Sequence, residues 1–310
     1  MNRWNLLSGC LACLVLLVPT QVNSATIRIC YPNKAQYAPF IIARETGAWK
    51  KSGLEVREIV LAGGGIHAAE SLIAGGADIA AMGDVPALIT LGRNENFHIL
   101  SSYMYSEKMH RIVVSGASGI DAAGDLKGKK IAVQTGTSTH GGLLLYLRQQ
   151  GIDAKDILWV PIPPQHFPEA VQSGEVDAIA GSEPWPQNVL DKNPTAYQLT
   201  DFSGLGNSFP HVILVSNDFL KAHPQEVATF LQVIAESIAM LREKPQEAAV
   251  IIAGSTGRTW QKEFAANAEM VWELSLDQRV EKSLIQTAGF LVAEGKLKKM
   301  PDIAGAMEKR

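Results

Sequence analysis

The pattern of apolar and polar positions between residues 26 and 182 divides into two similar halves. In each half, short apolar runs typical of strands alternate with stretches whose apolar residues recur at helical spacing. Strands are predicted at 26–31, 54–62 and 79–82, and again at 129–134, 157–163 and 176–180. Helices are predicted at 37–49 and 67–73, and again at 140–151 and 169–172. This β-α-β-α-β order predicts an α/β fold in which each half forms a mainly parallel sheet flanked by helices.

A repeated segment supports this division. The stretch ESLIAGGADIAAMGDVP (70–86) aligns with EAVQSGEVDAIAGSEPW (169–185) at an offset of 99 residues. The alignment pairs Gly75 with Gly174, Asp78 with Asp177, and Asp84 with Glu183. A glycine after an apolar helix predicts the helix end, and an aspartate before the next apolar run predicts the turn into a strand. Each copy therefore predicts a helix, a turn and a strand, and ends in a carboxylate followed within two residues by a proline.

The remaining chain is predicted to return to the first half. A strand is expected at 211–220, a helix from Pro224, and further helix at 259–310. The helix from Pro224 has apolar residues at spacings of three and four, typical of a core-facing stripe: Val227, Phe230, Leu231, Ile234 and Ile238. The expected division is lobe 1 at 25–107 and 211–310, lobe 2 at 108–210, and two hinge crossovers near 102–111 and 207–211.

Residues 1–24 have the pattern of a cleaved signal peptide. Arg3 is the only charged residue of this segment, an apolar run follows at 6–18, and the small residues Ser24 and Ala25 are typical of a cleavage site. The run is shorter than the roughly 20 apolar residues that cross a bilayer as a helix. The sequence therefore predicts an exported, soluble protein.

Cysteine positions agree with this prediction. The segment LSGC (7–10) has the form of a lipoprotein box, but most of the apolar run follows Cys10, so lipid attachment there is the alternative. Cleavage would remove Cys10 and Cys13 and leave Cys30 as the only cysteine. A mature chain without a possible internal disulfide depends on its hydrophobic core, and 46% of the residues in the full sequence are hydrophobic.

Charge and motif content exclude several classes of function. The formal net charge is −3, and no basic cluster of the kind that binds nucleic acid is present. The histidines are scattered, and no group of residues has the spacing of metal ligands. We therefore expect a protein that binds no nucleic acid, metal or cofactor.

Four motifs occur in order along the two halves: YAPFIIARETGAWKKSGLEV, GADIAAMGDVPAL, DLKGKKIAVQTGTSTHG and GEVDAIAGSEPW. Together they resemble the sulfonate-, taurine- and nitrate-binding proteins of ABC importers, over about residues 26–219. The resemblance implies the two-lobed type II periplasmic-binding-protein fold, with a small solute bound in the cleft between the lobes. It also implies a periplasmic monomer that delivers its solute to the permease and ATPase subunits of the inner membrane.

The candidate binding residues follow from the topology, because parallel sheets bind ligands at the carboxyl ends of their strands. The loops at these ends, with the return crossover, provide Gln36, Tyr37, Gly64, Gly83, Asp84, Thr137, Ser138, Thr139, His140, Glu183, Trp185 and His211. The hydroxyl-rich loop TGTSTHGG (135–142) opens a helix, whose N-terminal N–H groups favour an oxyanion. A small oxyanion is therefore the expected solute.

Each candidate also has a structural interpretation. One residue of 137–139 is expected to cap the helix, His140 could face solvent, and Trp185 could be a core aromatic. Asp84 and Glu183 could meet the ammonium group of a zwitterion, or could cap turns and bridge the lobes.

Three alternative functions remain open from the residues. A thiamine-precursor-type pyrimidine could stack on Trp185, Tyr37 and Phe209. Sulfinate desulfinases of this fold use a cysteine and a histidine placed as Cys30 and His67 are, although no arginine follows His67 closely here. A periplasmic sensor subunit would have the same pocket and another partner.

Overall fold

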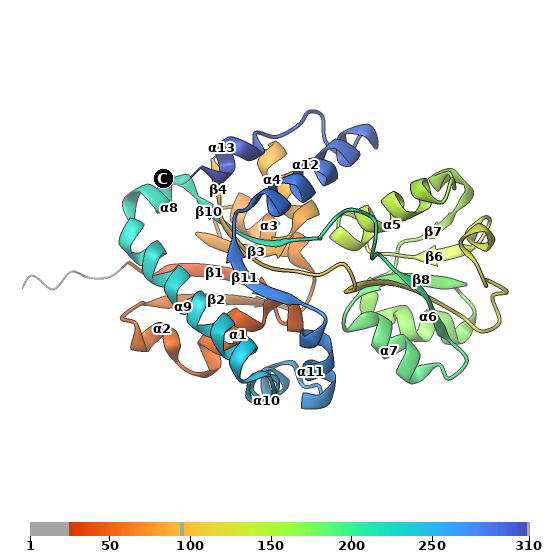
Figure 1. Ribbon diagram of the computed structural model, residues 1–310, viewed down its shortest axis with the longest axis horizontal. Helices are drawn as coiled ribbons and strands as arrows, with labels where there is room; N and C mark the ends of the chain where they lie inside the picture. The colour runs from red at the N-terminus through yellow and green to blue at the C-terminus, as the bar shows by residue number, and fades with distance from the viewer. Residues whose placement is uncertain (1–24, 94–95, 309–310) are drawn as a thin grey trace, which may run out of the picture.

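The computed structural model describes residues 25–93 and 96–308. Figure 1 shows two lobes, each built on a sheet flanked by helices, with the N- and C-terminal parts of the chain in the same lobe. The predicted two-lobed α/β fold is confirmed. The predicted signal peptide at 1–24, with Cys10 and Cys13, lies outside the described residues.

Lobe 1 contains a six-stranded sheet in the order β11-β4-β10-β3-β1-β2. Its strands are β1 (Ile27–Pro32), β2 (Val56–Leu61), β3 (Ile79–Gly83), β4 (Phe97–Tyr105), β10 (His211–Ser216) and β11 (Val271–Ser275). Its helices are α1 (Ala38–Glu45), α2 (Ala48–Lys51), α3 (Gly65–Ile73), α4 (Asp84–Arg93), α8 (Asn217–Ala222), α9 (Pro224–Glu243), α10 (Pro245–Thr256), α11 (Trp260–Ala268), α12 (Gln278–Ala293) and α13 (Ile303–Met307).

Lobe 2 contains a five-stranded sheet in the order β7-β6-β8-β5-β9. Its strands are β5 (His110–Val114), β6 (Lys130–Ala132), β7 (Leu158–Val160), β8 (Ala178–Ser182) and β9 (Tyr197–Asp201). Its helices are α5 (Ser138–Gln149), α6 (Phe167–Ser173) and α7 (Trp185–Lys192). Among the described residues, no helix is both long and apolar enough to cross a membrane.

Both sheets are mixed, whereas the sequence pattern predicts mainly parallel ones. The predicted parallel part is present, since β1 pairs in parallel with β2 and β3, and β6 with β7 and β8. The difference comes from the crossovers. The strand that enters each lobe from the other, β5 or β10, runs antiparallel to its two neighbours.

The repeated aspartates perform the same backbone role in each lobe. The carboxylate of Asp78 accepts the N–H of Arg28 at 2.9 Å, and that of Asp177 accepts the N–H of Lys130 at 2.8 Å. The N–H of each aspartate donates to the carbonyl of the same partner, at 2.8 and 2.9 Å. The repeat therefore marks the point where β3 begins beside β1 in lobe 1 and β8 begins beside β6 in lobe 2.

The chain changes sheet twice. It leaves β4 at Tyr105 and enters β5 at His110, and it leaves β9 at Asp201 and enters β10 at His211. These two segments are the connections that lie between the lobes in Figure 1.

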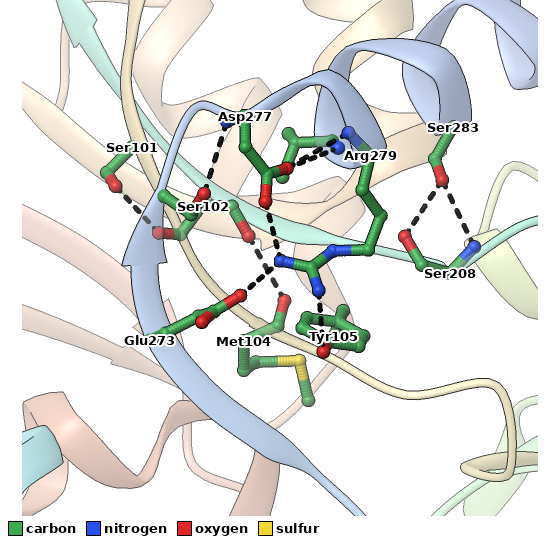
Figure 2. Close-up of polar contacts among 11 residues, drawn as sticks. Ser101, Ser102, Met104, Tyr105, Ser208, Glu273, Asp277, Arg279 and Ser283 are labelled. Carbon is green, nitrogen blue, oxygen red and sulfur yellow. Dashed lines mark hydrogen bonds and ion pairs between the residues drawn. The ribbon is translucent and has the colours of Figure 1, made fainter.

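The C-terminal segment contains a strand that the sequence pattern did not predict. Here β11 pairs with β4 on the edge of the first sheet, and Figure 2 shows the polar contacts that follow it. Arg279 donates to the Tyr105 hydroxyl at 2.8 Å and to Asp277 at 2.8 Å. Ser283 meets Ser208, hydroxyl to hydroxyl, at 2.8 Å. The start of α12 therefore holds the lobe 1 end of both crossovers.

Candidate functional site

A small chamber lies between the two lobes, where the strand-end loops of lobe 1 meet those of lobe 2. Its volume is about 50 Å³. This is room for about four water-sized groups, since one water needs about 10–15 Å³ on this measure. The inner chamber, as we call it, therefore matches a small polyatomic group in size.

Lobe 1 contributes the loop after β1 and three glycines, Gly64, Gly65 and Gly83. Gln36 is 1% exposed, and its amide donates to the carbonyl of Glu183 in lobe 2 at 2.7 Å. The side-chain amide oxygen of Gln36 is buried and has no hydrogen-bond partner among the described residues. A side chain at Gly83 would collide with the Ser138 hydroxyl across the cleft. Glycine at this position therefore allows the two lobes to touch.

Lobe 2 contributes the N-terminus of α5. Thr137 is the N-cap, because its hydroxyl accepts the N–H of His140 at 3.3 Å. Ser138 and Thr139 are buried at the mouth of the chamber. Free N–H groups of a first helical turn, with the positive end of the helix dipole, favour an anion at this wall.

Two buried histidines complete the polar wall. Burial lowers the pKa of both His110 and His211 to about 3, and the nearby charge of Lys34 acts in the same direction. Both rings are therefore neutral at pH 7. His110 contacts the Thr139 hydroxyl through Nδ1 at 2.8 Å, and its Nε2 is buried without a partner among the described residues.

His211 also lines the chamber. Its Nδ1 lies 3.2 Å from the hydroxyl of Tyr103. Burial raises the pKa of this phenol well above its ordinary value, so the hydroxyl keeps its proton. When Tyr103 donates to Nδ1, the proton of the neutral ring lies on Nε2; in the other tautomer Nδ1–H donates to the Tyr103 hydroxyl.

Lys34 is the only lysine or arginine among the described residues that line the chamber. Its Nζ lies 5.5 Å from the ring centroid of Trp185, a cation–π arrangement. Burial lowers the pKa of Lys34 to about 8, so the ammonium remains mostly protonated at pH 7. No aspartate or glutamate is found among the described lining residues, and the chamber therefore carries a single positive charge.

Nine of the twelve predicted site residues line the inner chamber. They are Gln36, Tyr37, Gly64, Gly83, Thr137, Ser138, Thr139, Trp185 and His211. Sequence reasoning missed Lys34, His110 and Gln134, which also line it. Lys34 could have been found from the sequence, because it is a cation in a loop that follows a predicted strand. Nothing in the pattern pointed to His110.

The other three predicted residues lie elsewhere. The carboxylate of Asp84 accepts the N–H of Val85 and the hydroxyl of Thr287, each at 2.8 Å, and burial raises its pKa. Glu183 pairs with Arg111 at 3.3 Å, and burial raises its pKa against the effect of that arginine. The two carboxylates therefore hold internal contacts and do not line the chamber.

His140 faces away from the chamber as well. Its ring packs edge-on against Trp159, with 5.9 Å between the ring centroids. Burial lowers its pKa to about 4. Phe209, a candidate for stacking a pyrimidine, is buried beside His110 and also does not line the inner chamber.

Cys30 lies in the core of lobe 1. It is fully buried between the sheet and α3, among residues such as Ala68 and Leu72, and lines neither the inner chamber nor the cavity beside it. Burial raises the pKa of its thiol, which opposes formation of a nucleophilic thiolate. His67 contacts Glu70 at 3.2 Å on the exposed surface of α3. This geometry argues against the desulfinase alternative.

We expect Cys30→Ser to leave ligand binding unchanged and to lower the free energy of unfolding by about 1 kcal/mol, a typical single-site effect. The reason is that the thiol acts only in packing. Urea unfolding and ligand titration of both proteins measure the two quantities. Release of sulfite from an aryl sulfinate by the wild type, lost in Cys30→Ser, would contradict this prediction.

Among the described residues, no group of three or more histidine, cysteine, aspartate or glutamate side chains is placed to hold a metal ion. The polar groups of the chamber instead include N–H and O–H donors around one ammonium, together with the side-chain amides of Gln36 and Gln134. Such a site suits the oxygen atoms of an anion.

Known proteins resemble the chain over most of its length. The profile of the family described as NMT1/THI5 like matches residues 34–248. A Bacillus subtilis (strain 168) protein named for binding aliphatic sulfonates is 28% identical over 216 residues, which cover 68% of this chain and 64% of that protein. The chain therefore aligns with less than two thirds of that relative's length.

Two further comparisons extend over nearly the whole chain. The taurine-binding periplasmic protein of Escherichia coli (strain K12) is 26% identical and is covered to 89%, as is this chain. The solved structure of an alkanesulfonate-binding protein from Xanthomonas axonopodis pv. citri, bound to MOPS, superposes with a TM-score of 0.82 at 23% identity. That match covers 92% of this chain and 99% of the other, and supports the two-lobed fold.

Proposed function

The chain belongs to the NMT1/THI5-like family, and from this premise we propose that it is the extracytoplasmic solute-binding component of an ABC importer. Its solute is a small oxyanion of the sulfonate or nitrate type. The observation that carries this proposal is the inner chamber, in which one ammonium, two neutral imidazoles and a helix N-terminus surround a space the size of such a group. The role is one of binding and release, without catalysis.

The charge of the chamber supports a monovalent solute. Lys34 balances one negative charge, and burial keeps His110 and His211 neutral. A second negative charge would have no cation opposite it, and an unpaired charge in a closed cleft is costly. Sulfonates and nitrate carry one charge at neutral pH, so they fit this balance.

The contacts between the lobes support binding by closure. Gln36 of lobe 1 donates to the Glu183 carbonyl of lobe 2, and Lys262 of α11 pairs with Asp191 of α7 at 2.5 Å. We propose that the two crossovers act as hinges, so that opening breaks these contacts and exposes the inner chamber.

The partners follow from the role. Relatives named for binding aliphatic sulfonates and, in the periplasm, taurine support delivery of the solute to a membrane permease with its ATPase. We propose that the protein acts there as a monomer. A sensor subunit would use the same chamber with another partner.

A thermal-shift panel tests the proposal. We expect methanesulfonate or nitrate to stabilise the protein by about 2.7 kcal/mol at one hundred times the dissociation constant. Taurine should act more weakly, because no carboxylate among the described lining residues meets its ammonium. A shift with an aminopyrimidine alone would favour the pyrimidine alternative, and the absence of a shift with every oxyanion would reject the proposed solute class.

A further inference from the structure

Lys34 differs from the other cations that lie between the lobes. Arg111 and Lys262 pair with carboxylates, whereas no carboxylate is found among the described residues that line the chamber around Lys34. Burial lowers the pKa of Lys34 to about 8. At pH 8 about half of the Lys34 side chains are therefore neutral amines, against about 0.3% for a lysine with the ordinary pKa of 10.5. A neutral lysine amine in a partly enclosed site is a nucleophile.

Gln36 and Trp185, which also line the chamber, each have a buried polar atom without a hydrogen-bond partner among the described residues. The Nε2 of Gln36 donates to the Glu183 carbonyl at 2.7 Å, which leaves Oε1 as an unpaired acceptor. The indole N–H of Trp185 is an unpaired donor. The Nζ of Lys34 lies 5.5 Å from the centroid of the same indole ring. The chamber therefore holds an acceptor, a donor and one amine, and it is costly to leave the first two unpaired.

Neither an ammonium alone nor a plain oxyanion alone satisfies both unpaired atoms. An ammonium cannot accept from the indole N–H, and the oxygens of a sulfonate or of nitrate carry no proton for the Gln36 oxygen. A carbamate on the lysine nitrogen has one N–H donor and two oxygen acceptors. Its carboxylate is small enough for a chamber of about 50 Å³, which has room for about four water-sized groups.

From this cluster we propose that Lys34 is a site of reversible carboxylation by carbon dioxide. The lone pair of the neutral Nζ forms a bond to the carbon of CO2, and one C–O π bond of CO2 becomes the negative charge of the new carboxylate. One of the two protons on the nitrogen passes to solvent, so the product is a carbamate, R–NH–COO⁻. Nothing is oxidised or reduced, and CO2 is the only co-reactant. Protonation of the nitrogen reverses the reaction.

The surroundings of Lys34 admit carbon dioxide and suit the product. A second cavity, of about 640 Å³, adjoins the inner chamber, and Lys34 lines both. Because CO2 is uncharged, it enters without the cost of removing a charge from water. The carbamate lies in the same chamber as the N-terminus of α5, which favours a negative charge. No aspartate or glutamate among the described lining residues opposes that charge.

Carboxylation excludes an anionic solute from the chamber. The carbamate takes the space of the solute and replaces the single positive charge of the chamber with a negative one. A bound anion in turn protects Lys34, because it favours the ammonium form of the nitrogen. The carbamate itself does not depend on the proposed function, whereas its competition with the solute does.

Carbon-13 NMR of the mature protein, equilibrated at pH 8 with labelled bicarbonate as the source of CO2, tests the proposal. We expect a carbamate resonance that is absent from Lys34→Arg and is lost at pH 6, where Lys34 is an ammonium. The α-amino group of the chain also reacts, and its resonance at pH 8 should remain in Lys34→Arg. Lys50→Arg, at an exposed position of α2, is the matched control and should give the wild-type spectrum.

Three further measurements place the carboxyl group. Alkylation of the wild type with a trialkyloxonium salt converts the carbamate to a stable ester, and peptide mass spectrometry should then find the added group on Lys34. Trp185→Phe keeps an aromatic ring and removes the indole N–H, so the Lys34 resonance should fall by about threefold or more. Methanesulfonate or nitrate should displace the Lys34 resonance of the wild type.

The outcomes separate this inference from the proposed function. A wild-type spectrum equal to that of Lys34→Arg, or bicarbonate that is held without modifying the lysine, would overturn the carbamate and leave the oxyanion function in place. A full resonance in Trp185→Phe would overturn the role of the indole N–H. A carbamate that both anions leave in place would overturn the competition. If these anions also cause no thermal shift, the oxyanion function fails and the carboxylation of Lys34 stands.

Discussion

Lowering the pH from 6.5 to 5 is expected to reduce the free energy of unfolding by about 3 kcal/mol through two histidines alone. Both His110 and His211 have a pKa of about 3 in the folded protein, against 6.5 in an unfolded chain. Over this range the unfolded state takes up protons that the folded state excludes. Because an unfolded histidine is already half protonated at pH 6.5, each histidine removes about 1.6 kcal/mol over the interval.

Other titrating groups change the total loss in the free energy of unfolding, but they do not change the difference between the wild type and a variant that lacks the two histidines. His140, with a pKa lowered to about 4, adds a smaller loss in the same direction. The buried carboxyls of Asp84 and Glu183 oppose it, because their raised pKa values let the folded state bind protons more readily as the pH falls. Substitution of the two chamber histidines isolates their share of the pH dependence.

The measurement is urea unfolding at pH 6.5 and pH 5. The double variant His110→Asn/His211→Asn keeps a polar atom near each Nδ1 contact and cannot titrate, so it should lose about 3 kcal/mol less than the wild type over the interval. His166→Asn, at an exposed position, is the control and should behave as the wild type does. Equal losses in the double variant and the wild type would contradict the assignment of two neutral buried histidines.

The repeat explains how much of the fold is predictable from sequence. Asp78 and Asp177 bind the N–H of the neighbouring strand in the same way, so a local pattern of helix, glycine, aspartate and strand marks the same structure twice. The strand-end loops follow from that order, and together with the return crossover they provide the nine predicted residues that line the inner chamber. Local pattern and topology were sufficient for these features.

Contacts between distant parts of the chain were not predictable in this way. Asp84 turns from the chamber because its carboxylate meets Thr287, 203 residues later in the chain. The repeat places a carboxylate at this turn but does not determine where it points. Similarly, β11 exists because its short segment pairs with β4, far earlier in the chain, and a five-residue edge strand has little pattern of its own.

Lys34→Met is expected to weaken methanesulfonate binding by roughly 30- to several thousand-fold. This range corresponds to the 2–5 kcal/mol that is lost when one partner of a buried charge pair is removed. The loss is large because Lys34 is the only cation among the described residues lining the inner chamber. Lys50→Met, at an exposed position of α2, is the matched control and should bind as the wild type does.

The pH dependence of binding separates the contribution of the Lys34 charge to the affinity from the contribution of the shape of its side chain. Burial lowers the pKa of Lys34 to about 8 in the unliganded protein, whereas methanesulfonate keeps one negative charge throughout. Above pH 8 binding must therefore take up a proton, and the affinity should fall about tenfold per pH unit until the pKa of the complex is reached. Lys34→Arg retains its charge to much higher pH and should bind with nearly constant affinity between pH 8 and 10. Calorimetric titration across this range measures both slopes. If the wild-type affinity were constant there, or if Lys34→Met bound within threefold of it, the helix N-terminus and the two imidazoles would hold the anion without the ammonium.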